Sequence, residues 1–315
     1  MKDLLLKLLS AEDTSEFVVK ELRKYTKSIN IDALGSIKAS FGDKAKVLVD
    51  AHLDKVGLIV TAVEGDFVRA EQVGGIDPHI LPSTKLAIHT PEEKVPAVGI
   101  STAPRLKKGD GKKLKLEELY FCTNTSKVSV GDRISFAEQP ELFGDGQIIS
   151  PALDDLAGVA VILYVLSKTK NPKGLEVIFS VGEELGLRGA SAQSFKSEAE
   201  IAVAIDASFG NAPNVPERKC GKVGGGVMIG VSPSLNAELS DSLTSLAKDN
   251  KIAYQLEVMA GMTGTNSDVL DLPARKTALL SVPIRNMHTP SETMLIKDAE
   301  ATAELLAEFL KANLL

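Results

Sequence analysis

The stretch Ile201-Ala-Val-Ala-Ile-Asp206 is a continuous apolar run that ends in a carboxylate. The run Leu175–Val181 (LEVIFSV) is also a continuous apolar strand pattern, and Ala45–His52 (AKVLVDAH) is a strand signal that ends in polar residues. Helical patterns lie between the three runs. Strands that are apolar along their whole length belong to sheets whose two faces are both covered. The sequence therefore predicts an α/β domain in which helices cover both faces of a sheet.

Further elements of this domain are expected on either side of these runs. Periodic apolar residues predict helices at Met1–Ser10, Ser15–Lys27, Leu153–Ser167, Ala190–Lys196, Leu235–Asn250 and Ile296–Leu315. Shorter apolar runs predict strands at Val56–Val63, Ile252–Val258 and Thr277–Pro283. Because Lys7 interrupts the first leucine run and no cleavage site follows, we expect a surface helix there rather than a signal peptide.

The middle of the chain has a different pattern of apolar and turn-forming residues. Between residues 64 and 148, short β-like runs alternate with turns such as Gly74-Gly-Ile-Asp-Pro78. This pattern is typical of a small all-β module, and the basic run Arg105–Lys113 within it is interpreted as a solvated turn. We therefore expect a discontinuous α/β domain of residues 1–63 and 149–315, with a β-rich domain of residues 64–148 inserted in it.

Composition and charge exclude several classes of function. The chain has 315 residues with 36 Lys and Arg against 42 Asp and Glu, a net charge of −6. A sequence-independent nucleic-acid binder needs a basic face, so we expect no nucleic-acid partner. No run approaches the roughly 20 apolar residues of a membrane helix, so we expect no membrane partner. Cys122 and Cys220 form no CxxC pattern, which is typical of reduced thiols in a cytoplasmic protein.

Residues of the types that bind metal ions occur at the ends of predicted strands or in the loops that follow them. In open α/β sheets, binding sites form at the carboxyl ends of the strands. The chain has only four histidines, of which two belong to this set, while His79 and His89 lie in the β-rich domain and are interpreted as structural. The full set is His52, Asp154, the adjacent pair Glu183 and Glu184, Asp206 and His288.

This set of residues suits a centre with two metal ions. Imidazole and carboxylate ligands fit Zn²⁺ or Co²⁺. A carboxylate that bridges two ions about 3.5–4 Å apart lets them activate one water and polarise a carbonyl together. The pair Glu183–Glu184 can supply one ligand and one general base from consecutive positions. Asp54, two residues after His52, can accept the imidazole N–H and set its tautomer.

Each of these residues also has a purely structural interpretation. His52 can be a satisfied histidine after a strand, and His288 can cap a loop. Asp154 and its neighbour Asp155 can be N-caps of a helix. The glutamate pair can lie in a solvated loop, and Asp206 can be a cap or turn residue. Spacing alone leaves both the metal centre and these alternatives open.

At these residues the chain resembles the tetrahedral (TET) aminopeptidase family. This group of dinuclear metallo-aminopeptidases includes glutamyl and deblocking aminopeptidases and some members labelled endoglucanases. The resemblance covers nearly the whole chain, in the correct order. The motifs that carry it are Asp32-Ala-Leu-Gly-Ser-Ile37, Ala51-His-Leu-Asp-Lys-Val-Gly57, Gly74-Gly-Ile-Asp-Pro78, Ala152-Leu-Asp-Asp155 with Ala157-Gly158, Glu183-Glu-Leu-Gly-Leu-Arg-Gly189, Asp206, Gly264-Thr265 and Pro283-Ile-Arg-Asn-Met-His-Thr-Pro-Ser-Glu292.

The resemblance implies both a fold and a reaction. The family fold is a zinc-peptidase α/β/α sandwich with an inserted, barrel-like dimerisation domain. Family members remove N-terminal residues from peptides in the cytosol, and they commonly assemble from dimers into tetrahedral dodecamers. We therefore expect a cytoplasmic metalloprotease of the aminopeptidase type that binds two divalent ions, Zn²⁺ or Co²⁺, and forms a homo-oligomer.

Carried over position by position, the resemblance also implies a role for each site residue. His52, Asp154 and Asp206 would hold one ion. Asp154 would bridge to the second ion, which Glu184 and His288 would complete. Glu183 would be the general base, and Asp54 would orient His52.

Four positions depart from the family pattern. The family usually has Glu at the position of Lys55, Arg at that of Leu156, Gln at that of Gly182 and Asp at that of Asn266. None of the four is a ligand or the base in the assignment above. They leave the preferred N-terminal residue and the level of activity open.

Two other functions fit parts of this pattern. A glycoside hydrolase uses two carboxyl groups about 5–9.5 Å apart. Adjacent glutamates do not ensure that separation, and a chain without Trp lacks the flat apolar platforms of a sugar cleft. The second alternative is a catalytically degenerate assembly protein on the same scaffold, which the four departures motivate.

Overall fold

The computed structural model describes residues 1–102, 114–169 and 172–314 of the chain. These residues form two compact units, which are described separately. The first unit is built from Met1–Asp54, Pro140–Met287 and Glu292–Leu315, and the second from Lys55–Gln139 and His288–Ser291. The basic run at 105–113 lies outside the described residues.

A single eight-stranded sheet forms the centre of the first unit. Its four neighbouring strands β12, β3, β13 and β16 are all parallel, so their carboxyl ends share one edge. In sheet order the strands are β1 (Ile29–Ile31), β2 (Ile37–Phe41), β12 (Leu175–Ser180), β3 (Val47–His52), β13 (Ile201–Phe209), β16 (Lys276–Ile284), β14 (Val227–Val231) and β15 (Tyr254–Val258).

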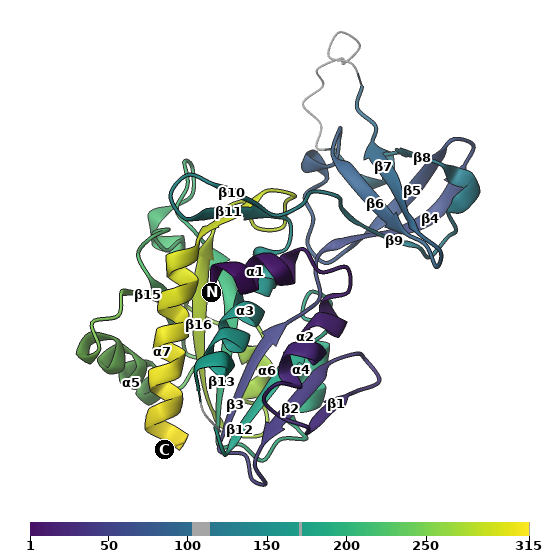
Figure 1. Ribbon diagram of the computed structural model, residues 1–315. Coiled ribbons are helices and arrows are strands. Elements are labelled where there is room, and N and C mark those ends of the chain that lie inside the picture. The colour runs from purple at the N-terminus through teal and green to yellow at the C-terminus, as the bar shows by residue number, and fades with distance from the viewer. Residues whose placement is uncertain (103–113, 170–171, 315) are drawn as a thin grey trace. The chain divides into compact units, whose positions relative to one another are not determined.

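Helices cover both faces of this sheet. On β3, Val47, Val49 and Ala51 belong to one apolar core and Leu48 to another, because successive side chains of a strand point to opposite faces. Helices α3 and α7 pack on the first core and α4 and α6 on the second (Figure 1). The helices are α1 (Lys2–Leu9), α2 (Thr14–Leu22), α3 (Leu153–Lys168), α4 (Arg188–Ser194), α5 (Ala237–Asp249), α6 (Ser267–Leu270) and α7 (Ile296–Leu314).

A small antiparallel sheet completes the first unit. Its strands are β10 (Glu141–Phe143), β11 (Gln147–Ser150) and β17 (Glu292–Leu295), with β11 in the middle. Because Ser150 pairs with Glu292, this sheet brings the start of α3 and the segment before α7 together. That pairing helps to position residues of the candidate site.

The second unit contains a closed six-stranded barrel with its own apolar core. In barrel order the strands are β4 (Gly57–Glu64), β5 (Phe67–Val73), β8 (Phe121–Thr123), β7 (Lys94–Gly99), β6 (Lys85–His89) and β9 (Arg133–Phe136). Short 3₁₀ turns occur at η1 (Pro78–Ile80), η3 (Leu116–Glu118) and η4 (Thr125–Lys127), and in the first unit at η5 (Glu217–Lys219).

The predicted fold class, an α/β sandwich with an inserted β-barrel, is confirmed, while several element boundaries differ. The barrel unit starts at Lys55 rather than at residue 64, because β4 pairs with β5 and β9. Strand β13 continues past Asp206 to Phe209, since it stays in register with β16 over its whole length. Among the described residues, no helix combines the length and the apolar character that crossing a membrane requires.

Candidate metal centre

The shared carboxyl edge of the parallel strands carries most of the predicted site residues. His52 is the last residue of β3, and Asp206 is the sixth of the nine residues of β13. Glu183 and Glu184 lie in the loop between β12 and α4, and Asp154 lies at the start of α3. Parallel strands that end at one edge place such residues close together.

Three of these residues form a buried group that could hold a metal ion. His52 Nε2 lies 3.2 Å from an Asp154 carboxylate oxygen and 3.9 Å from one of Asp206. Ligand atoms of all three lie within 4.8 Å of one another, and the residues are 1%, 7% and 5% exposed respectively. One imidazole and two carboxylates are a donor set that suits Zn²⁺ or Co²⁺.

The tautomer of His52 favours metal binding. Its Nδ1 lies 3.0 Å from the main-chain oxygen of Asp54, so Nδ1–H donates there and Nε2 faces the two carboxylates. The Asp54 carboxylate is farther from Nδ1, at 3.7 Å. The main chain of Asp54, rather than its side chain, therefore makes the closest contact with the imidazole.

The carboxylate of Asp54 orients a different part of the site. Its two oxygens accept the main-chain N–H groups of Glu183, at 3.1 Å, and of Glu184, at 3.2 Å. The loop reaches this position through Gly182, which has φ = +84°, a conformation that favours glycine. Asp54 thus sets the position of the predicted base and its neighbour.

Burial and neighbouring charges shift the pKa values of this group. Burial raises the pKa of Asp206 well above its ordinary value, and the nearby Asp155 and Asp154 carboxylates raise it further. Burial alone would lower the pKa of His52, but the surrounding aspartates raise it well above its ordinary value. A divalent cation among these groups would compensate the buried negative charge.

The two glutamates lie beside this group. A Glu184 carboxylate oxygen lies within 4.8 Å of one of Asp154. Burial raises the pKa of Glu183 to about 7, and the neighbouring charges of Glu184, Asp154 and Asp54 add to the rise against the opposing effect of His52. A carboxylate whose pKa lies near neutrality is suited to accepting and returning a proton.

Two further carboxylates support the site, and spacing alone did not assign them a role. Asp155 is fully buried and accepts the main-chain N–H of His52 at 3.2 Å and that of Gly158 at 3.0 Å. The second bond is the helix-capping contact that was the structural alternative for this residue. Glu292, 1% exposed, accepts the main-chain N–H of Asp154 at 3.0 Å.

His288 belongs to the second unit, as part of the segment His288–Ser291. Its φ of 62° is in the left-handed region, and its Nδ1 lies 2.7 Å from the main-chain oxygen of Gly75. That contact makes Nδ1 the hydrogen-bond donor, which leaves Nε2 as the nitrogen that could bind a metal ion. Its role as a ligand stays a prediction.

The four positions that depart from the family pattern have different surroundings. Lys55 is exposed, and Leu156 is fully buried in the main core. A Cβ on Gly182 would lie 3.4 Å from the Cβ of Arg188, in addition to the unfavourable φ. Asn266 is buried and hydrogen-bonded to Asp50.

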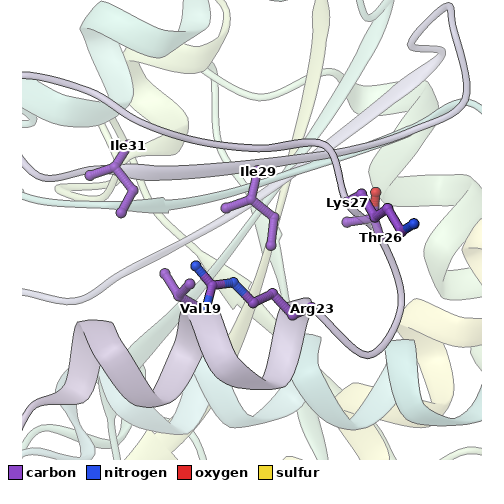
Figure 2. A pocket seen from close by; sticks show the side chains of 6 residues that line it. All are labelled: Val19, Arg23, Thr26, Lys27, Ile29 and Ile31. Atoms are coloured by element: carbon purple, nitrogen blue, oxygen red, sulfur yellow. The ribbon is translucent and has the colours of Figure 1, made fainter.

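A hollow of about 420 Å³ between α2 and β1 is not part of this centre. Figure 2 shows Val19 and Arg23 rising from the helix toward Ile29 and Ile31 of the strand. Thr26 and Lys27 complete the lining, which holds no carboxylate or imidazole to bind a metal ion. Strands β2 and β12 separate β1 from the strand that carries His52.

The chain is similar in sequence to known aminopeptidases. The family model for M42 glutamyl aminopeptidases matches residues 35–305. The lysyl aminopeptidase of Pyrococcus furiosus is 30% identical over 94% of this chain and 90% of its own length.

Two solved structures have the same fold. An aminopeptidase from Desulfurococcus kamchatkensis superposes with a TM-score of 0.90 at 23% identity, covering 98% of this chain and 94% of that one. The TET1 peptidase of Pyrococcus horikoshii, described as assembling into a tetrahedron or a large octahedral shell, gives 0.86 at 24% identity and 98% coverage of both chains.

Proposed function

The chain belongs to the M42 glutamyl aminopeptidase family, and we propose that it removes N-terminal residues from peptides with two divalent metal ions and with Glu183 as general base. Membership of this family makes it a metal-dependent aminopeptidase, a hydrolase of peptide bonds. The glycoside hydrolase alternative is not favoured, since the family and the curated relative are aminopeptidases.

The observation that carries the proposal is the buried group of His52, Asp154 and Asp206, with Glu183 beside it. These three residues would hold one ion. Asp154 would also reach the second ion, with Glu184 and with His288 from the second unit. The donor set favours Zn²⁺ or Co²⁺ as the ions.

The residues of the chain would share the chemistry. When bound, two ions would supply a water of lowered pKa and a polarised scissile carbonyl. Glu183 would accept the proton of the attacking water and pass it to the departing amine. Asp54 would hold Glu183 in position through the main-chain bond described above.

Assembly and location belong to the same proposal. A homo-oligomer is supported by the tetrahedron or large octahedral shell described for the Pyrococcus horikoshii peptidase. The assembly would be built from dimers, up to a tetrahedral dodecamer, as the family resemblance implies. The barrel unit would be the dimerisation domain. A cytoplasmic location is supported by the two cysteines, which are both free thiols.

The test compares Glu183→Gln with the unchanged protein after loading with Zn²⁺ or Co²⁺. With amino-acid p-nitroanilides as substrates, we expect turnover to fall by about 10²–10⁴-fold, the usual contribution of a general base. Metal content measured by mass spectrometry should stay at two ions per chain. Glu198→Gln is the matched control, because Glu198 is exposed.

Each outcome has a distinct meaning. Unchanged turnover in Glu183→Gln would refute the role of Glu183. Fewer than two ions per unchanged chain would refute the dinuclear centre, and inactivity of the fully loaded protein on all peptides and p-nitroanilides would favour the degenerate assembly protein.

A further inference from the structure

A buried polar cluster adjoins the strand ends that carry the candidate metal centre. It consists of Asp50, Ser180 and Asn266, which are 0%, 0% and 2% exposed. The Asn266 side-chain amide donates to an Asp50 carboxylate oxygen at 2.6 Å and to the Ser180 hydroxyl at 2.8 Å. The Ser180 hydroxyl donates to the same Asp50 oxygen at 3.2 Å.

Two members of the cluster are directly connected to site residues. Asp50 and His52 are two residues apart on β3, so their side chains point to the same face of the sheet. Ser180 ends β12, is the register partner of His52, and accepts the main-chain N–H of Leu53 at 2.8 Å. The loop that bears Glu183 begins directly after Ser180.

Asn266, the third member of the cluster, comes from a distant part of the chain. It precedes α6, yet its side chain makes no capping bond to that helix. Instead its amide N–H groups donate hydrogen bonds to Asp50, which is 216 residues away, and to Ser180. The amide is the donor that this arrangement requires, since a carboxylate offers only acceptors when ionised.

We propose that Asn266 is a positioning residue for the aminopeptidase reaction. By holding Asp50 and Ser180, it keeps the end of β3, with His52, and the loop with Glu183 in the relative positions that the metal centre needs. This inference rests on the proposed function.

The experiment loads the full-length protein with Co²⁺ and records its visible absorption spectrum, which reports ligand geometry without any substrate. Asn266→Asp replaces the donor with an acceptor at almost constant shape. We expect altered cobalt bands and a kcat lower by about 10–100-fold, the usual effect of disturbing a group that supports metal ligands. The KM should stay within about twofold.

Rescue by exchange separates this role from general destabilisation. The double variant Asp50→Asn with Asn266→Asp restores one amide and one carboxylate, and the rotatable Ser180 hydroxyl can adapt to either. We expect it to recover most of the wild-type cobalt spectrum. Asn236→Asp is the matched control, because Asn236 caps α5 as an acceptor and an aspartate preserves that bond.

A wild-type cobalt spectrum in folded Asn266→Asp would overturn the proposal, whatever its turnover. If Asn266→Asp does not fold, the double variant decides, since altered bands in the folded double variant would equally overturn it. Because the spectrum needs no peptide substrate, these outcomes are distinct from failure of the proposed function, which Glu183→Gln tests.

Discussion

Three carboxylates around this site accept main-chain N–H groups of predicted site residues. Each holds a predicted ligand or base by its backbone, which fixes where the side chain starts. The pairs are Asp155 with His52, Glu292 with Asp154, and Asp54 with both Glu183 and Glu184. A hydrogen bond to a charged acceptor is stronger than a neutral one, so these anchors are well suited to a rigid site.

Replacing Asp54 by Asn should loosen the loop that bears Glu183. One of the two acceptor oxygens would become an N–H₂ donor that faces a main-chain N–H. We expect kcat to fall by about 10–100-fold with metal content retained. Initial rates and metal analysis check this, with Asp66→Asn on an exposed turn as control. A rate within twofold of wild type would contradict the role of Asp54.

Gly158 leaves room for the Asp155 carboxylate. A Cβ on Gly158 would lie 2.5 Å from an oxygen of Asp155, so Gly158→Ala should displace the group that holds His52. We expect metal affinity to fall by about tenfold and the free energy of unfolding to fall by about 1–3 kcal/mol. Metal titration and urea unfolding measure the two effects.

The control for this substitution is Gly261→Ala, because no atom lies within 4 Å of a Cβ at Gly261. It should leave both quantities unchanged. Wild-type metal affinity in Gly158→Ala would show that Asp155 does not need its observed position.

At the scale of elements, the first turn of α7 anchors a glycine loop. The fully buried carboxylate of Asp298 accepts the main-chain N–H groups of Gly224, at 2.6 Å, and Gly226, at 2.9 Å. Burial raises the pKa of Asp298, and these two bonds only partly oppose the rise. The helix and the loop before β14 are therefore joined through one ionisable group.

This raised pKa predicts a pH dependence of stability. The folded chain binds the Asp298 proton more tightly than the unfolded chain, whose pKa is near 3.8. The resulting stabilisation is complete below that pH and is lost as the pH rises through the folded-state pKa. Urea unfolding from pH 4 upward should therefore show a steeper fall in the free energy of unfolding for wild type than for Asp298→Asn.

Asp241→Asn, on the exposed face of α5, is the control and should keep the wild-type pH profile. Equal slopes for wild type and Asp298→Asn would mean that the Asp298 pKa does not change on folding.

At the scale of the whole molecule, the candidate centre couples metal binding to stability. Burial and the neighbouring carboxylates raise the pKa values of Asp155 and Asp206, so a bound cation would favour the charged forms of these buried groups. Ligands that bind only the folded state stabilise it by mass action.

Chelation should consequently lower the thermal midpoint. We expect a drop of about 5–10 °C after metal removal and recovery on adding Zn²⁺ or Co²⁺, measured by differential scanning calorimetry. Asp206→Asn, which lacks one proposed ligand, should respond much less. An equal midpoint with and without chelator, in protein of verified metal content, would rule out this coupling.

Local patterns in the sequence predicted the α/β fold class and an inserted all-β module, and they indicated the candidate site residues. Largely apolar runs identified β3, β12 and β13, because a strand buried on both faces is apolar at most positions. Short or half-exposed strands such as β1 and β17 were missed, since tertiary pairing rather than periodicity creates them. The carboxylates and His52 were predicted as site residues because polar residues that follow buried strands are conspicuous in a sequence.

By itself, the sequence determined that this is an α/β protein with a barrel inserted in it and metal-type ligands at its strand ends. Only the tertiary structure decided which of these residues are joined by hydrogen bonds. Asp155 meets His52 across 103 residues, Glu292 meets Asp154 across 138, and Asn266 meets Asp50 across 216. The physical reason is that periodicity records which face a residue presents, whereas its hydrogen-bond partner depends on how distant segments pack.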